Sequence, residues 1–84
     1  MSKIEKIVLK FKSKPSDFTF DELIKLLRYY GYSLSNKGKT SGSRVIFTNP
    51  THQDICIHRP HKRNYLLQYQ INIIEKILNA EKLL

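Results

Sequence analysis

The stretch TFDELIKLLRYYG, residues 19–31, carries signals for both ends of a helix. Thr19 followed by Glu22 matches a capping box, in which each side chain bonds the backbone N–H of the other residue. Apolar residues recur every three to four positions after Thr19, and Gly31 supplies the left-handed conformation at which helices commonly stop. The stretch therefore predicts an amphipathic helix over residues 20–30.

The sequence on either side predicts the other elements. Upstream of Pro15, apolar residues at helical spacing indicate a helix over residues 3–13. Downstream of Gly31 the apolar period changes to two, which is typical of strands, and a helical period returns near the C-terminus. The predicted strands are residues 32–36, 44–49 and 53–58, and the predicted last helix is residues 67–82.

This order of elements predicts an α+β fold of two layers, in which helices cover one face of a three-stranded antiparallel sheet. We expect residues 1–84 to form a single domain, because a chain this short supports only one small core. The α-β-β-β-α order, preceded by an extra N-terminal helix, resembles the double-stranded RNA-binding domain, which reads RNA mainly by shape.

The composition indicates a polyanionic partner. The chain has 15 Lys and Arg against 7 Asp and Glu, a net charge of +8. Nucleic acid is the commonest partner of a compact basic domain, although a basic surface can also serve solubility alone. The single cysteine excludes an internal disulfide. With no signal peptide or membrane span in the pattern, we expect a cytoplasmic protein; its oligomeric state is not predicted.

Four segments together resemble the HicA (YcfA-like) family: FDELIKLLRYYGY (20–32), KTSGSRVIF (39–47), ICIHRPHKRN (55–64) and YLLQYQINIIEKIL (65–78). The resemblance implies a toxin of a type II toxin–antitoxin pair. Such toxins are small endoribonucleases, or mRNA interferases, and a cognate antitoxin inhibits them by covering the active surface. Ile46 is expected on the outer face of the sheet, where an antitoxin segment would cover it.

The sequence departs from the family pattern at Arg44. The family typically has Gly-Ser followed by the histidine used for cleavage, and here Ser43 is followed by Arg44. A guanidinium stays protonated far above neutral pH, so it neither takes nor gives a proton there. Arg44 is suited instead to bind the scissile phosphate and stabilise its developing charge. Proton transfer must then come from another residue.

His58 and His61, in the His-Arg-Pro-His sequence after the last predicted strand, are the candidates for that proton transfer. Histidine is the natural acid and base near neutral pH, because its ordinary pKa is about 6.5. Alternatively, both histidines only bind phosphate or order the loop. His52 lies in a predicted turn and is expected to be incidental.

The expected RNA-binding residues come from two predicted loops and the segments beside them. Their positive charges suit phosphate, and an exposed tyrosine can stack on a base. They are Lys37, Lys39, Ser43, Arg44, Arg59, Lys62, Arg63 and Tyr65.

We predict neither a metal site nor a cofactor. Cys56, His58 and His61 fall short of the four ligands of a structural zinc site, and the usual paired spacing is absent. Strand cysteines commonly pack as small hydrophobes, and this is the interpretation that we favour for Cys56.

The leading hypothesis is therefore a metal-independent endoribonuclease with Arg44, His61 and His58 as catalytic residues. Two alternatives follow from the missing histidine. One is a catalytically inactive RNA-binding module, which binds RNA without cleaving it. The other is a protein-interaction domain, whose basic loops dock an acidic partner and which has no affinity for RNA.

Overall fold

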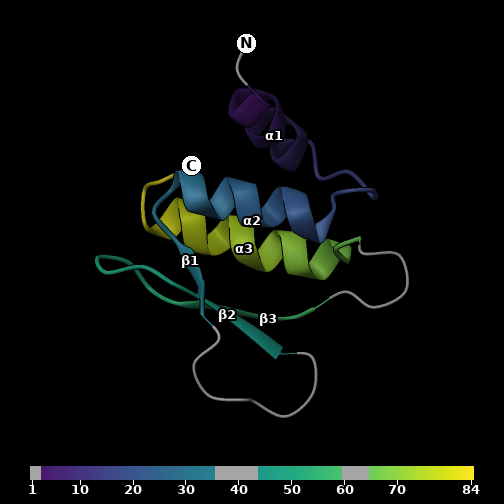
Figure 1. The fold of residues 1–84 in the computed structure, drawn as a ribbon. Helices are drawn as coiled ribbons and strands as arrows, with labels where there is room; N and C mark the ends of the chain where they lie inside the picture. Colours follow the sequence, from purple (N-terminus) through teal and green to yellow (C-terminus); the bar gives the residue numbers. More distant parts are fainter. Residues whose placement is uncertain (1–2, 36–43, 60–64) are drawn as a thin grey trace.

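The computed structural model describes residues 3–35, 44–59 and 65–84 (Figure 1). Over these residues the chain forms three helices and a three-stranded antiparallel sheet with the strand order β1-β2-β3. The elements are α1 (Lys3–Lys12), α2 (Phe20–Tyr29), β1 (Ser33–Ser35), β2 (Arg44–Thr48), β3 (Ile55–His58) and α3 (Gln68–Ala80). The predicted α+β class is confirmed, and the arrangement is compatible with a fold like the double-stranded RNA-binding domain.

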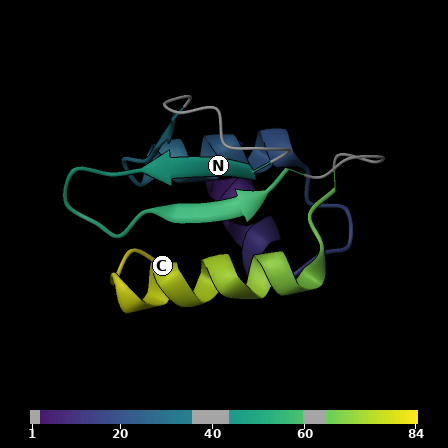
Figure 2. The ribbon, with the colours of Figure 1, turned by 90° about the horizontal axis from the view of Figure 1, so that it is seen from below.

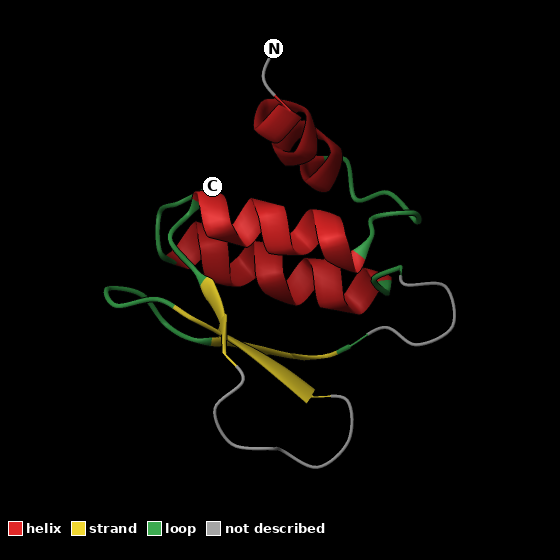
Figure 3. Ribbon diagram, viewed as in Figure 1, coloured by secondary structure: helices red, strands yellow, loops and turns green. Residues whose placement is uncertain are grey.

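The layers follow from the sheet having one apolar face. Helices α2 and α3 lie side by side over that face, and α1 lies on the far side of this helix layer from the sheet (Figures 1, 2 and 3). The core between the layers is apolar: Phe11, Phe18, Phe20, Leu23, Leu26, Leu27, Tyr32, Phe47, Ile55, Ile57, Leu66, Ile71, Ile74 and Leu78 are all buried. Among the described residues, no helix is long and apolar enough to cross a membrane.

Helix α2 has the ends that its sequence predicts. The backbone N–H of Glu22 donates to Thr19 Oγ1 at 3.1 Å, and the backbone N–H of Thr19 donates to Glu22 Oε1 at 2.9 Å, which completes the capping box. At the other end Gly31 has φ +92°, and Tyr32 donates its backbone N–H to Leu27. A Cβ at Gly31 would also lie 3.1 Å from the Asn49 amide nitrogen. Glycine therefore suits this turn both by its positive φ and by its lack of a side chain.

The strand register sorts the side chains onto two faces. Phe47 pairs with Leu34 on one side and with Ile55 on the other, and these residues face the helices. Since alternate residues of a strand point to opposite faces, the neighbours of Phe47 belong to the outer face. The half-buried Ile46 is one of them, on the face that was expected for it.

Helix α3 runs from Gln68 to Ala80, shorter than the predicted 67–82 at both ends. Leu67 has no side-chain oxygen to cap the helix, and the chain leaves the helix through Lys82, which has φ +59°. At the C-terminal end, the carboxylate of Glu81 accepts the backbone N–H of Gln53 at 2.9 Å, and its Oε1 lies 3.1 Å from His52 Nδ1. His52 is therefore not incidental, because it joins the β2–β3 turn to the end of α3.

Helix α1 is held by one core side chain and by polar links to both other helices. Phe11 is fully buried and meets Phe18 edge-on, with ring centroids 5.3 Å apart. Lys10 donates to Glu22 at 3.0 Å, and Lys14, just after the helix, pairs with Glu75 of α3 at 3.2 Å. These links place α1 against α2, one residue shorter than the predicted 3–13.

Candidate nucleic-acid interface

The outer face of the sheet brings together two of the predicted catalytic residues. Arg44, the first residue of β2, pairs in register with His58, the last residue of β3. Directly opposite residues on neighbouring strands project to the same face with Cβ atoms roughly 5 Å apart. Both residues are exposed, so an arginine and a histidine occupy neighbouring positions on a surface open to a large ligand.

The same end of the molecule carries Arg59. Its guanidinium carbon lies 5.1 Å from the centroid of the Phe20 ring, in the geometry of a cation–π contact. Phe20 is buried, so the contact is made on a ring that the core already holds still. A guanidinium stacked in this way keeps its in-plane N–H groups available to phosphate oxygens.

Tyr65 is placed next to the start of α2 by a backbone pairing. The backbone of Tyr65 forms an isolated antiparallel bridge with Thr19, and Leu66 donates its N–H to the Phe18 carbonyl at 2.8 Å. Tyr65 is 42% exposed, and base stacking requires an exposed ring.

Figures 1 and 2 show why these residues converge. The start of β2, the end of β3 and the N-terminal ends of α2 and α3 all lie at one end of the molecule. Arg44 and His58 are the residues at the two strand ends, and Arg59 directly follows β3. Tyr65 precedes α3 and pairs with Thr19, just before α2. We call Arg44, His58, Arg59 and Tyr65 the strand-end cluster; its described side chains are cationic, imidazole and aromatic.

A buried amide, which the sequence analysis did not single out, supports this cluster. Gln70 is 3% exposed, and its Nε2 donates to the His58 carbonyl at 2.9 Å. Its Oε1 accepts the backbone N–H of Leu67 at 3.0 Å. Gln70 was missed because a polar residue near a helix start is ordinarily solvated. Only its spacing from Ile71 and Ile74, which puts it on the buried face of α3, would have indicated otherwise.

The other predicted site residues, Lys37, Lys39, Ser43, His61, Lys62 and Arg63, lie outside the described residues. The interpretation of Cys56 as a packed hydrophobe is wrong: Cys56 is exposed. It is opposite Ile46 in the register and so belongs to the outer face, two residues before His58. In the described part of the chain, no group of three His, Cys, Asp or Glu side chains is placed to hold a metal ion.

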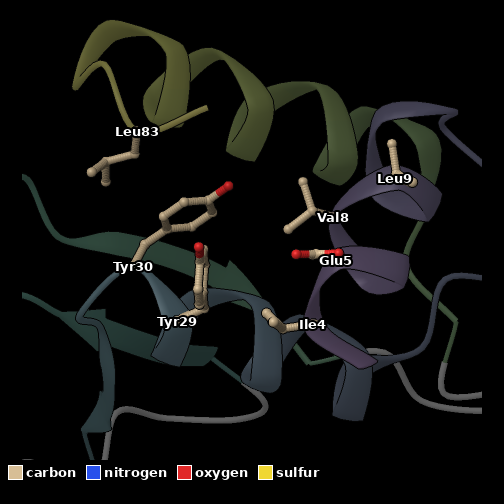
Figure 4. A pocket seen from close by; sticks show the side chains of 7 residues that line it. All are labelled: Ile4, Glu5, Val8, Leu9, Tyr29, Tyr30 and Leu83. Carbon is tan, nitrogen blue, oxygen red and sulfur yellow. The ribbon is translucent and has the colours of Figure 1, made fainter. Parts of the chain in front are cut away.

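A hollow of about 350 Å³ lies elsewhere, between α1, the end of α2 and the C-terminus (Figure 4). Its lining is largely apolar and aromatic: Ile4, Val8, Leu9, Tyr29, Tyr30 and Leu83, together with the carboxylate of Glu5. A surface that binds phosphate needs positive charge, and this lining supplies none. The strand-end cluster is therefore the better candidate for contact with nucleic acid.

Residues 20–80 match the family described as the HicA toxin of bacterial toxin–antitoxin systems. The chain belongs to the HicA toxin family. The match begins at the first residue of α2 and ends at the last residue of α3, so it includes the whole strand-end cluster and leaves α1 outside. Family membership makes the chain a toxin of a toxin–antitoxin system, for which a cognate antitoxin is the expected partner. No curated protein and no solved structure matches the chain.

Proposed function

We propose that this HicA-family toxin is an endoribonuclease whose active surface is the outer face of the sheet around Arg44 and His58. The observation that carries the proposal is the register of β2 and β3, which sets these two side chains opposite each other. A cation beside an imidazole combines binding of a phosphate with transfer of a proton, the two tasks that RNA cleavage requires.

The proposed reaction uses the 2′-hydroxyl of the RNA as nucleophile. Its oxygen attacks the neighbouring phosphorus while the bond to the 5′-oxygen breaks, which leaves a cyclic phosphate and a free 5′-hydroxyl. One proton leaves the 2′-hydroxyl and one is delivered to the 5′-oxygen. Arg44 binds the phosphate oxygens and stabilises their added negative charge. His58 transfers a proton, and His61 is the second candidate for that task.

Binding of RNA is proposed to extend from this pair across the basic segments. Arg59 contributes its in-plane N–H groups, and Tyr65 offers an exposed ring for stacking. The remaining proposed contacts are Lys37, Lys39, Ser43, Lys62 and Arg63. The substrate is mRNA in the cytoplasm, and the cognate antitoxin inhibits cleavage by covering the outer face of the sheet, including Ile46.

The test is cleavage of an RNA with single-stranded and structured parts by the purified chain in EDTA. Arg44→Ala, His58→Ala and His61→Ala are compared with Cys56→Ser, which alters the same face of β3 two residues away from His58. We expect Arg44→Ala and one histidine variant to abolish cleavage, and Cys56→Ser to leave it unchanged. Loss of cleavage without loss of binding identifies the proton-transfer residue.

A second candidate function is an RNA-binding module without catalysis, and the arginine in place of the family histidine favours it. This alternative predicts salt-dependent binding of RNA that stays intact through long incubation. Intact RNA in the assay above would contradict the nuclease proposal. Absence of binding even at low salt would contradict both and leave a protein-interaction domain.

A further inference from the structure

The Gln70 amide is the buried polar side chain of the described core. Burying an amide costs free energy unless both of its ends are hydrogen bonded. Both ends are: Oε1 accepts from the Leu67 backbone at 3.0 Å, and Nε2 donates to the His58 carbonyl at 2.9 Å. One side chain therefore joins the first turn of α3 to the last residue of β3.

The bond to His58 acts on the peptide unit that joins His58 to Arg59. A fixed carbonyl limits rotation about the backbone bonds on either side of that unit, so the directions of both side chains are limited too. His58 is the last ladder residue opposite Arg44, and Arg59 leaves the sheet there to reach Phe20. His58 is therefore held in two ways: by its pairing with Arg44 in the sheet, and by the bond from Gln70 to its carbonyl.

Capping of α3 alone does not account for an amide at this position. A glutamate three residues after the cap accepts the Leu67 N–H equally well, and its charge is favoured at the start of a helix. A carboxylate, however, has no hydrogen to donate. The amide N–H₂ of Gln70 is thus needed for the bond to His58 and not for the cap of α3.

We propose that Gln70 is a positioning residue, which sets His58 and Arg59 relative to Arg44 through the His58 carbonyl. The inference rests on the proposed function for its catalytic consequence, but not for its structural one. Removal of the donor should misplace the imidazole while the helix cap survives.

The decisive variant is Gln70→Glu, which keeps the acceptor for Leu67 and, when ionised, lacks the donor for His58. Gln68→Glu is the matched control: it adds the same charge two residues away, where the Gln68 amide bonds the Lys14 and Pro15 carbonyls instead. At neutral pH we expect Gln70→Glu to move the His58 imidazole resonances in ¹H–¹³C spectra. We expect kcat to fall about 10- to 100-fold, with KM within roughly threefold. Gln68→Glu should change neither.

Acidification provides a rescue. A protonated carboxyl has an O–H to donate, so lowering the pH should restore the bond to His58 in Gln70→Glu and return its spectrum toward wild type. Gln70→Met, which has no donor at any pH, should show no such return. Among the described residues, the titratable and charged groups at this strand end are His58 and Arg59 at the end of β3 and Arg44 on β2. Wild type and Gln68→Glu, which carries the same added charge, are therefore measured at every pH, and each Gln70 variant is compared with them at the same pH.

The outcomes separate this inference from the proposed function. If wild type cleaves no RNA but the His58 resonances move in Gln70→Glu and return on acidification, positioning stands and the nuclease fails. If Gln70→Glu cleaves like wild type and its His58 resonances are unmoved, positioning is overturned. In the unaltered chain, exchange of the Gln70 side-chain amide protons with solvent should be slow, because the donor is buried and hydrogen bonded. Exchange at the rate of a free amide would overturn the inference, whatever the variants do.

Discussion

At the scale of single residues, Arg59 connects the core to the proposed RNA surface. Its contact with the buried Phe20 ring orders a side chain that would otherwise lose several rotamers on binding. A phosphate contact made by an ordered guanidinium therefore costs less entropy than one made by a free lysine. This is the reason to expect Arg59, among the many cations of the chain, to contribute to RNA affinity.

Substitution of Arg59 tests this expectation. Each phosphate contact to single-stranded RNA contributes roughly −0.7 to the slope of log affinity against log salt, so Arg59→Gln should make the slope shallower by about 0.7. Affinity is measured by fluorescence anisotropy at several salt concentrations. Lys12→Gln removes one charge from the exposed side of α1 and should leave the slope as it is. An unchanged slope in Arg59→Gln would remove Arg59 from the interface.

The candidate site could be predicted from the sequence as residue types but not as contacts. Arg44 and His58 stand out by their chemistry and by their places at the ends of predicted strands. Their pairing depends on the register of the hairpin, which the composition of the turn does not determine. The Arg59–Phe20 and Gln70–His58 contacts join separate segments, and no local pattern signals them. The exposure of Cys56 could have been predicted, because Cys56 and His58 are two residues apart on one strand and so lie on the same face.

At the scale of elements, the quality of the local signals explains which boundaries the sequence predicts. Helix α2 has a capping box and a terminal glycine, and the predicted range differs from the observed one by a single residue. Helix α3 has neither, because Leu67 stands at its cap and Lys82 takes the left-handed position. Its ends are set by tertiary bonds, from Gln70 to His58 and from Glu81 to Gln53, which the sequence does not display.

The capping box of α2 can be tested by Thr19→Ala. The substitution removes the hydroxyl that accepts the Glu22 N–H at 3.1 Å. We expect a loss of about 1 kcal/mol in the free energy of unfolding, measured by urea denaturation. Ser16→Ala removes an exposed hydroxyl in the linker before the helix and should stay within about 0.5 kcal/mol of wild type. Equal effects of the two substitutions would mean that the cap adds nothing.

The link between α1 and α2 should make stability depend on acid pH. Partial burial raises the pKa of Glu22, but hydrogen bonds from the Thr19 backbone and from Lys10 outweigh it, so the net shift is downward from 4.5. A lowered folded-state pKa means that the contribution is complete above the ordinary value and is lost as the pH falls through the folded one. Stability should therefore decline below about pH 4.5.

Glu22→Gln identifies this carboxylate as a source of that decline. The variant should be less stable than wild type near neutral pH, and the difference should shrink as the pH falls through the lowered pKa of Glu22. Glu81, whose pKa is lowered by the Gln53 N–H and then by His52, contributes in the same direction and is unaltered in both proteins. Melting temperatures from pH 3 to pH 7 measure the difference. A constant difference across that range would show that Glu22 is not linked to folding in this way.

At the scale of the whole molecule, α1 stands apart from the family match yet reaches the core. The matched region begins at Phe20, whereas Phe11 of α1 is fully buried among the core residues and contacts the Phe18 ring. If α1 folded as a separate appendage, substitutions in it would not alter unfolding of the remainder. Its packing instead predicts that the helix and the matched region unfold together, as one domain would.

Two substitutions on α1 distinguish these possibilities. Phe11→Ala removes a buried ring and should destabilise the chain by about 3 to 5 kcal/mol, because the cavity cost adds to the lost burial. Leu9→Ala, on the same helix but 54% exposed, should cost far less.

The unfolding should be followed through the strand-end cluster, for example by NMR signals of His58, so that the probe lies on the sheet and not on α1. A sheet transition that Phe11→Ala leaves in place would show that α1 folds independently. A transition that moves with Phe11→Ala and not with Leu9→Ala would show that the surface bearing Arg44 and His58 draws part of its stability from a helix beyond the family region.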